Sequence, residues 1–401
     1  MGKFQQQIVS IQKSLHDHQL SGWLLHDFRH SNELALNFLK ISSETKLTRR
    51  FFYWIPQIGE AVKIVSIVEP YVLEHLPGEK WVYKEWSDLQ ALLASICRNS
   101  MRIAMEYSPL NALPTISKVD AGTVELVEQF GAKVVSSANL LQTYTSVLTP
   151  EQIKSHRYAA NVLEEVVKET WIYIQQSLKQ EQIISEYDVQ QFMLKLIDKK
   201  GCVTQSAPTC ATNIHSADPH YSPTQENASI IKKEDFILLD LWCKQKESSS
   251  IYADITRVGV AAAESTNEQN TIFNSVRKAQ KSALSFIKER IANKKVIEGW
   301  EVDRLCRSII QEEGYGDFFI HRTGHNLGEE VHGPGANLDD FETHDNRELI
   351  PGTVFTIEPG IYLPHEPYGF GVRLEFDVYL GFDRRVEVTN QIQEKIVCLK
   401  I

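Results

Sequence analysis

Four carboxylates and one imidazole, spread along the C-terminal half, constrain this chain more than any other feature. Each lies within or at the edge of a segment that is typical of a β-strand, namely FILLDLW, YADITRVGV, HRTGHNLGEEVHG, FTIEPGIY and GVRLEFDVYL. The five residues are Asp240, Asp254, His325, Glu358 and Glu375. A buried carboxylate without a partner is costly. Any one of them taken alone is more simply explained by a salt bridge, but the ordered set of five indicates a shared metal site.

The type of donor indicates which metals fit. Carboxylate and imidazole ligands suit Mn, Co or Zn better than a metal that prefers thiolates. Four carboxylates and one histidine are enough to hold two divalent cations that share bridging oxygens. Such a pair activates water and polarises a carbonyl group. The sequence therefore predicts hydrolytic chemistry.

Histidines gather around the fifth donor. His321, His325 and His332 lie within twelve residues, and glycines interrupt the segment. This pattern predicts a sharply bent backbone that presents imidazoles to a cavity. His220, in DPHYSP, is a fourth candidate, although by itself it is more typical of a loop residue.

The chain divides into two expected domains, residues 1–147 and 148–401. In the first, helical and strand-like patterns alternate, which indicates an α/β module. Strands are expected at 23–27, 51–55, 61–68, 102–107 and 133–135, and helices near 86–98 and 119–130. We find no metal constellation or phosphate loop in this part of the sequence, which favours a scaffold or an oligomerisation domain.

The second domain is expected to begin with a helix. Thr149-Pro150-Glu151-Gln152 combines an N-cap threonine, a proline at the first helical position and a glutamine at the capping-box position. Further helices are expected over 185–200, 266–292 and 298–313. The remaining segments are strand-like and paired.

Composition excludes several classes of protein. The net charge is −10, and no cluster of lysine and arginine offsets it, which argues against a nucleic-acid partner. No apolar run reaches the length of a membrane span, and the N-terminus lacks the apolar core of a secretory signal. The six cysteines are scattered and are expected to be reduced thiols. We therefore expect a cytoplasmic enzyme.

The motifs PHYSP, ILLDL, YADITR, HRTGHNLGEEVHG, IEPGIY and GVRLE occur in the order found in a known family. Over roughly residues 150–400 the chain resembles the pita-bread metallopeptidases, which include aminopeptidase P, prolidase and methionine aminopeptidase. The N-terminal part resembles, more weakly, the α/β domain of prolidase, aminopeptidase P and creatinase, which methionine aminopeptidase lacks. The resemblance implies an α/β domain followed by an α+β domain, a curved antiparallel sheet with outer helices.

The resemblance also implies roles for individual residues. Asp240 corresponds to a ligand of one metal, His325 and Glu358 to ligands of the other, and Asp254 and Glu375 to bridging ligands. Glu358 is also placed for proton transfer. His332 and His220 correspond to histidines that contact the substrate, and His321 corresponds to an outer-shell or substrate-side histidine. Arg373 corresponds to an arginine near the bridging glutamate, and Arg257 to a structural arginine.

The implied reaction is hydrolysis of the bond after an N-terminal residue, with small peptides carrying proline at the second position as substrates. The implied cofactors are two divalent ions, with manganese favoured over cobalt or zinc. The resemblance further implies a homodimer formed through or near the N-terminal domain. Dipeptides, as for prolidase, and longer chains, as for aminopeptidase P, both remain open.

The chain departs from the family pattern near the expected site. Trp242 replaces the usual glycine, Val258 the usual threonine, and Asn326 follows the metal histidine. The loop from Asp240 to Asp254 is longer than usual by about three residues, a change that hairpin tips tolerate. Two alternatives share the fold: a metal-free hydrolase like creatinase and a non-catalytic binding protein. Retention of all five ligands argues against both.

Overall fold

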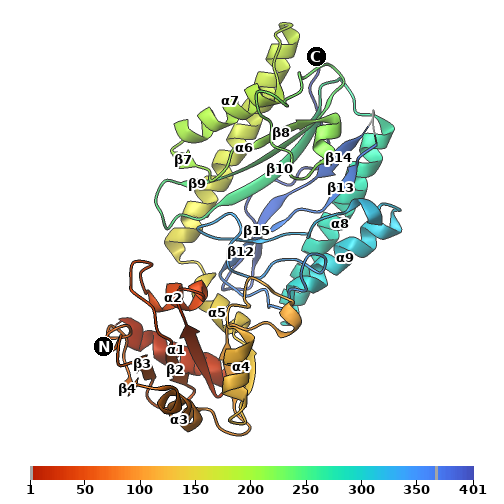
Figure 1. Cartoon of the computed structure of the whole chain (residues 1–401). Coiled ribbons are helices and arrows are strands. Elements are labelled where there is room, and N and C mark those ends of the chain that lie inside the picture. Colours follow the sequence, from red (N-terminus) through yellow and green to blue (C-terminus); the bar gives the residue numbers. More distant parts are fainter. Residues whose placement is uncertain (1–2, 366–368) are drawn as a thin grey trace. The chain divides into compact units, whose positions relative to one another are not determined.

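The computed structural model describes residues 3–365 and 369–401, and the chain forms two compact units, Met1–Thr145 and Ser146–Ile401 (Figure 1). Within the described residues, no helix is long and apolar enough to cross a membrane.

The N-terminal unit is built around a six-stranded mixed sheet with the order β4-β3-β2-β1-β5-β6. Its strands are β1 (Gly22–Asp27), β2 (Phe51–Pro56), β3 (Val62–Ser66), β4 (Glu79–Tyr83), β5 (Arg102–Met105) and β6 (Lys133–Ser136). Its helices are α1 (Lys3–Asp17), α2 (Glu33–Leu39), α3 (Trp86–Ile96), α4 (Ala121–Glu128) and α5 (Ala138–Thr145).

Both faces of this sheet are buried. In β1, Trp23 and Leu25 join one hydrophobic cluster and Leu24 joins another, because successive strand side chains point to opposite faces. The sequence did not predict β4, α2 or α5. In β4 only Tyr83 is buried, so the apolar pattern that marks a strand is weak there.

Four long helices of the C-terminal unit lie where the sequence predicts them. They are α6 (Pro150–Lys179), α7 (Glu186–Lys199), α8 (Asn267–Ala292) and α9 (Gly299–Glu312). The capping box that begins α6 is present, since the Gln152 N–H donates to Thr149 Oγ1 over 3.2 Å and the Thr149 N–H donates to Gln152 Oε1 over 3.0 Å. In this unit α6 packs on α7, and α8 packs on α9 (Figure 1).

The strands of this unit form three sheets. One has the order β17-β10-β9-β7 with β8 also paired to β9, a second the order β11-β12-β15-β16, and the third pairs β13 with β14. Their bounds are β7 (Cys202–Val203), β8 (Thr209–Thr212), β9 (Phe236–Gln245), β10 (Ala253–Val260), β11 (Asn326–Leu327), β12 (Thr353–Ile357), β13 (Gly360–Leu363), β14 (Phe370–Arg373), β15 (Phe376–Leu380), β16 (Val386–Val388) and β17 (Val397–Cys398).

The pattern of GVRLEFDVYL predicts one strand-like segment, but the structure divides it between two strands. Phe370–Arg373 pairs with β13, Phe376–Leu380 pairs with β12, and the chain changes sheet between them. The Leu374 N–H donates to the Pro359 carbonyl over 3.3 Å. This hydrogen bond joins the link between β14 and β15 to the segment that follows β12. Helix α6 contacts β9 and β10, while α8 contacts β12, β13 and β14. These two helices therefore cover different strands.

Candidate metal centre

The β9–β10 hairpin brings two of the predicted ligands to one face of its sheet. Asp254 lies opposite Trp242, and Thr256 lies opposite Asp240. Since side chains two residues apart share a face and directly paired residues point the same way, these four side chains form one patch. The Thr256 Oγ1 lies 2.9 Å from Asp240 Oδ1. Sequence reasoning gave Thr256 no role.

His325 comes from the segment that runs beside β12. Its N–H donates to Thr356 Oγ1 over 3.0 Å, and the Thr356 N–H donates to the His325 carbonyl over 2.8 Å. The preceding Gly324 permits this approach, because a Cβ there would lie 2.1 Å from the Thr356 carbonyl oxygen. Glycine at this position therefore lets the histidine segment lie against the strand.

Glu358 follows the end of β12, where Pro359 interrupts the strand, and Glu375 lies at the crossing between β14 and β15. Both glutamates therefore lie just outside regular strands, at points where the chain leaves one strand. All five predicted ligands line one cavity of about 700 Å³. The other predicted site residues that line it are His220, His321, His332 and Arg373.

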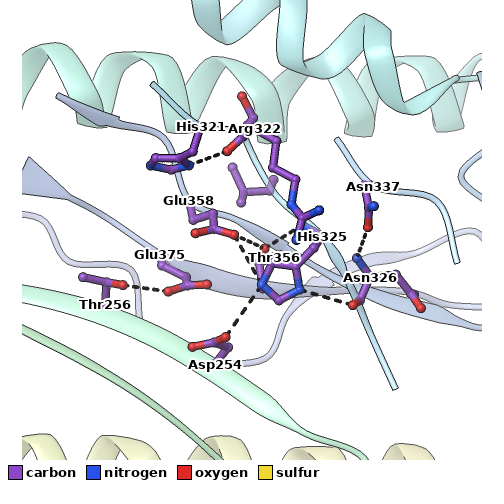
Figure 2. Close-up of polar contacts among 12 residues, drawn as sticks. Asp254, Thr256, His321, Arg322, His325, Asn326, Asn337, Thr356, Glu358 and Glu375 are labelled. Atoms are coloured by element: carbon purple, nitrogen blue, oxygen red, sulfur yellow. Dashed lines mark hydrogen bonds and ion pairs between the residues drawn. The ribbon is translucent and has the colours of Figure 1, made fainter. Parts of the chain in front are cut away.

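Three of the five ligands are close enough to share a cation. Ligand atoms of Asp254, His325 and Glu375 all lie within 4.8 Å of one another. His325 Nε2 is 3.7 Å from Asp254 Oδ2 and 3.3 Å from Glu358 Oε1, so Glu358 borders the same group (Figure 2).

Asp240 is directed to protein partners instead. Its Oδ2 forms a short ion pair with the Arg373 guanidinium, and its Oδ1 is bonded to the Thr256 hydroxyl. The same hydroxyl lies 2.7 Å from Glu375 Oε2 and accepts a hydrogen bond from Arg373 Nε over 3.0 Å. Thr256 and Arg373 thus link Asp240 to Glu375.

The donor set fits divalent cations. Asp254 Oδ1 and Glu375 Oε1 are buried and have no hydrogen-bond partner among the described residues. Burial raises the pKa of both carboxyls well above the ordinary value, and neighbouring carboxylates raise each further. Buried carboxylate oxygens of this kind need a compensating positive charge, and a metal supplies it. Both of these oxygens belong to residues that are expected to bridge the ions, and Asp377 Oδ1 is a further buried carboxylate oxygen without a partner among the described residues.

The orientation of His325 is that of a metal ligand. Its Nδ1 lies 3.2 Å from the Asn326 carbonyl, which accepts only, so Nδ1 carries the proton. The lone pair of Nε2 then faces Asp254 and Glu358. Burial lowers the pKa of His325 well below its ordinary value, and this keeps the imidazole neutral. A second hydrogen bond that fixes the tautomer is the usual arrangement around metal-binding histidines.

Asn326 explains one departure from the family pattern. Its side chain donates to the Val354 carbonyl over 2.8 Å and accepts from the Gly335 N–H over 2.9 Å. Its own N–H donates to Asn337 Oδ1 over 3.1 Å (Figure 2). Asn326 therefore ties the glycine-rich histidine segment to β12.

His321 forms an outer link in the site. Its Nδ1 donates to the Arg322 carbonyl over 2.7 Å, and its Nε2 therefore accepts from the Tyr362 hydroxyl, also over 2.7 Å. Tyr362 in turn accepts from the Arg373 guanidinium over 3.2 Å. Burial, followed by the nearby Arg373 charge, lowers the pKa of His321 to about 3. Tyr362 was overlooked in the sequence, although it stands in the quoted IEPGIY motif.

His332 and His220 lie at the cavity wall. The His332 ring centre is 4.4 Å from that of His325, at an interplanar angle of 74°. Burial, with the Arg322 charge second, lowers the pKa of His332 to about 4, so the imidazole is neutral near pH 7. The His220 N–H donates to Asp218 Oδ1 over 2.9 Å, and His220 is exposed and lines the same cavity.

Trp242 forms part of the cavity wall and, like Val331, packs against the hydrophobic cluster that contains Tyr252 and Leu327. Its indole Nε1 is buried without a hydrogen-bond partner in the described part of the chain. The tryptophan thus occupies space beside the ligands that a glycine would leave open.

The charge of the site predicts a pH-dependent stabilisation by metal. Burial raises the pKa of Glu358 from 4.5 to about 7. Without metal, the folded state then holds a proton that the unfolded state releases, so this group makes the protein less stable as pH rises from about 4.5 to about 7, by about 3 kcal/mol. Ligands must be deprotonated to bind metal. Added Mn should therefore raise the unfolding midpoint more at pH 8 than at pH 5.

Thermal unfolding with Mn and with a chelator, at both pH values, measures this difference. The Glu358→Gln protein is the comparison, because it lacks one of the carboxyls with a raised pKa and should show a smaller change with pH. Equal Mn-induced shifts at both pH values in the unsubstituted protein would contradict the proposed ligand set.

Fold and donor set together define a two-domain metallopeptidase architecture, in which an N-terminal α/β domain is followed in sequence by a pita-bread domain. The chain belongs to metallopeptidase family M24, whose model matches residues 154–381. An uncharacterised peptidase of Staphylococcus epidermidis is 35% identical over 180 residues. The match covers 45% of each chain, so it spans less than half the length of that relative. A candidate dipeptidase of Bacillus subtilis, YkvY, is 29% identical over 268 residues, 67% of each chain.

Solved structures share the whole architecture. Dipeptidase PepE from Mycobacterium ulcerans has a TM-score of 0.65 at 17% identity and covers 99% of this chain and 98% of its own. The Xaa-Pro dipeptidase from Bacillus anthracis has a TM-score of 0.58 at 21% identity, over 98% and 99%. The N-terminal domain of the FACT complex subunit SPT16 from Cicer arietinum also reaches 0.58, at 11% identity over 96% and 95%. These likenesses show the fold alone.

Proposed function

We propose that this protein is a metal-dependent peptidase that cleaves the bond after the N-terminal residue of short peptides with proline in second position. The observation that carries the proposal is the convergence of Asp254, Glu375 and His325 in one cavity, with two carboxylate oxygens that lack partners. The M24 membership and the dipeptidase and prolidase neighbours support the choice of substrate.

The five donors divide between two ions, with manganese the favoured metal. Asp240 would hold one ion, His325 and Glu358 would hold the other, and Asp254 and Glu375 would be shared by both. Such a metal pair supplies an activated water near neutral pH and polarises the scissile carbonyl. Arg373 and Thr256 link the side chains of Asp240 and Glu375 through hydrogen bonds and an ion pair.

Glu358 takes the proton that the attacking water loses and passes it to the leaving nitrogen. Its Oε1 lies 3.3 Å from His325 Nε2, beside the proposed ligands, where a carboxylate is placed for general-base work. The Thr356 hydroxyl lies 3.1 Å from Glu358 Oε1 and orients the carboxylate. His332 and His220 donate to the developing oxyanion from the cavity wall, a contribution of about 3 kcal/mol for one such donor.

Two other functions are compatible with the fold. SPT16 is described as a subunit of the FACT complex and not as a peptidase, so the fold by itself does not establish hydrolysis. A metal-free hydrolase like creatinase or a binding protein has no need of a buried carboxylate cluster with unpartnered oxygens. The intact donor set therefore favours the metallopeptidase over both.

Arg322 points to dipeptides as the preferred substrates. The lysines and arginines that line the cavity, among the described residues, are Arg322 and Arg373, and Arg373 is paired with Asp240. In the described part of the chain, the Arg322 side chain has no carboxylate within ion-pair distance, yet its charge lowers the pKa of His325 and His332, after burial in both cases. The carboxyl carbon of a dipeptide lies about 2.5 Å from the scissile nitrogen. Arg322 is available to bind that carboxylate.

Hydrolysis of Xaa-Pro and Xaa-Pro-Yaa peptides in the presence of Mn tests the proposed function. We expect cleavage of both types or of dipeptides alone, and we expect Arg322→Met to raise KM for dipeptides by about tenfold or more, as for a lost hydrogen bond to a charged group. Tripeptide KM should change less, because its carboxylate lies farther away.

Arg304→Met removes an exposed arginine that does not line the cavity and serves as the control. Absence of cleavage with every Xaa-Pro peptide would refute the proposed substrate class. Equal losses on dipeptides and tripeptides in Arg322→Met would refute the role given to Arg322.

A further inference from the structure

A buried glutamate outside the cavity holds the loop that carries His220. Glu186 is the first residue of α7, its side chain is fully buried, and it is absent from the cavity lining. The loop begins at the end of β8, includes the short helix Asn213–Ala217, and returns toward β9 past residue 229. His220 lies in its middle.

The Glu186 carboxylate accepts hydrogen bonds from both ends and the centre of this loop. Oε1 accepts from the Thr212 N–H over 2.6 Å and from the Thr212 hydroxyl over 2.8 Å. Oε2 accepts from the Tyr221 hydroxyl over 2.6 Å and from the Ser229 N–H over 2.7 Å. His215 Nδ1 lies 2.9 Å from Oε2 and 3.0 Å from Oε1. One side chain thus organises a loop of about twenty residues, and this is typical of a buried polar network with every member satisfied.

The connection to the catalytic cavity runs through Tyr221. Its ring stacks on His215 with ring centres 4.2 Å apart, and its backbone carbonyl accepts from the Thr209 hydroxyl over 3.0 Å. Thr209 lies on β8 and pairs with Asp240 on β9, so the residue after His220 is tied to the strand beside the one that carries a predicted ligand. On the other side, Asp218 accepts from the His220 N–H over 2.9 Å.

The His220 imidazole itself has no hydrogen bond to another described residue of the protein, although it lines the cavity. Its position is therefore set by its backbone. We propose that Glu186 is a positioning residue for the reaction and acts by fixing the backbone on both sides of His220. This inference rests on the proposed function for its kinetic consequence, while the structural part stands without it.

Glu186→Gln is the informative substitution. It keeps the volume of the side chain but turns one acceptor oxygen into an amide donor, which then faces the N–H of Thr212 or of Ser229. Tyr221→Phe removes one hydroxyl, which donates to Glu186 Oε2 over 2.6 Å and lies 3.4 Å from the Asn227 carbonyl, and is the milder variant. Asp188→Asn is the matched control, because Asp188 lies on the same helix and caps it through Ser185 but has no hydrogen bond to residues 212–229.

The test compares these three variants in the natural background and in a His220→Ala background. In the natural background, Glu186→Gln and Tyr221→Phe should lower kcat by about tenfold with unchanged metal content, and Asp188→Asn should leave kcat unchanged. In the His220→Ala background, Glu186→Gln should cause no further loss. An equal loss in both backgrounds would overturn the proposal, because Glu186 would then act on some other group. Unchanged kcat in Glu186→Gln would overturn it as well.

A readout independent of hydrolysis separates this inference from the proposed function. In protein labelled with carbon-13 at histidine Cε1, the resonance that disappears in His220→Ala identifies His220. That resonance should shift in Glu186→Gln and in Tyr221→Phe but not in Asp188→Asn. If Glu186→Gln fails to fold, Tyr221→Phe decides by the same two measurements. If the unsubstituted protein hydrolyses peptides but the His220 resonance does not shift in these variants, the inference is wrong. If the resonance shifts but the unsubstituted protein hydrolyses no Xaa-Pro peptide, the inference stands and the proposed function is wrong.

Discussion

Asp254→Ala and Glu375→Ala should each lose both metal ions and hydrolysis, with kcat/KM lower by about a thousandfold or more. Each carboxylate has one buried oxygen without a partner among the described residues, and each is proposed to serve two ions. Removing a shared ligand therefore weakens both metals at once. The loss corresponds to the several kcal/mol that a metal contributes to stabilising the transition state. Metal analysis of the purified variants, together with kcat/KM on one Xaa-Pro substrate, measures both effects.

Asp240→Ala is the informative contrast, because Asp240 is proposed to bind a single ion. That variant should lose one ion preferentially. Glu330→Gln is the control, since Glu330 is an exposed acid that lines the cavity but is not among the proposed ligands. Native metal content with near-normal turnover in Asp254→Ala would show that the ligand set is wrong.

His332→Ala should keep both metals and lose about a hundredfold in kcat. His332 lies beside His325 without being part of the group of close metal-ligand atoms. Because its pKa is lowered to about 4, the neutral imidazole is available near pH 7 as a hydrogen-bond donor. The expected loss is that of one donor to a developing oxyanion.

His344→Ala is the control for this substitution, because His344 is exposed and is paired with Asp340 away from the cavity lining. Three outcomes are separable by metal content and kcat. Loss of metal in His332→Ala would make His332 a ligand or a structural support. Unchanged kcat would make it a bystander. Retained metal with reduced kcat is the result that supports the proposed role.

Much of the C-terminal unit follows from local sequence signals. The Thr149–Gln152 capping box begins α6 as predicted. Ser185 caps α7, since its Oγ accepts a hydrogen bond from the Asp188 N–H over 3.1 Å. Capping residues and helical periodicity act over a few positions, so one segment is enough to read them. The sequence indicated the candidate ligands for a related reason, because an acid in an otherwise apolar strand requires compensation, and their role as ligands stays a prediction.

Other parts of the site depend on contacts between distant segments. Tyr362 is held by hydrogen bonds to His321 and Arg373. Glu186 accepts hydrogen bonds from a loop, the last of them from Ser229, 43 residues later in the chain. Neither residue interrupts a local pattern, since a tyrosine in a strand and a glutamate in the first turn of a helix are ordinary choices. The break of GVRLEFDVYL into two strands likewise depends on its partners β12 and β13 and not on its own alternation.

The central claim is that hydrolysis requires the metal cluster built on Asp254, Glu375 and His325. Its most direct test is to remove metal from the purified protein with a chelator, measure Xaa-Pro hydrolysis and bound metal, and repeat both after adding Mn. The account predicts that hydrolysis is lost with the metal and returns with Mn, at about two ions per chain, as a two-metal site requires. Full activity in rigorously metal-free protein would contradict it.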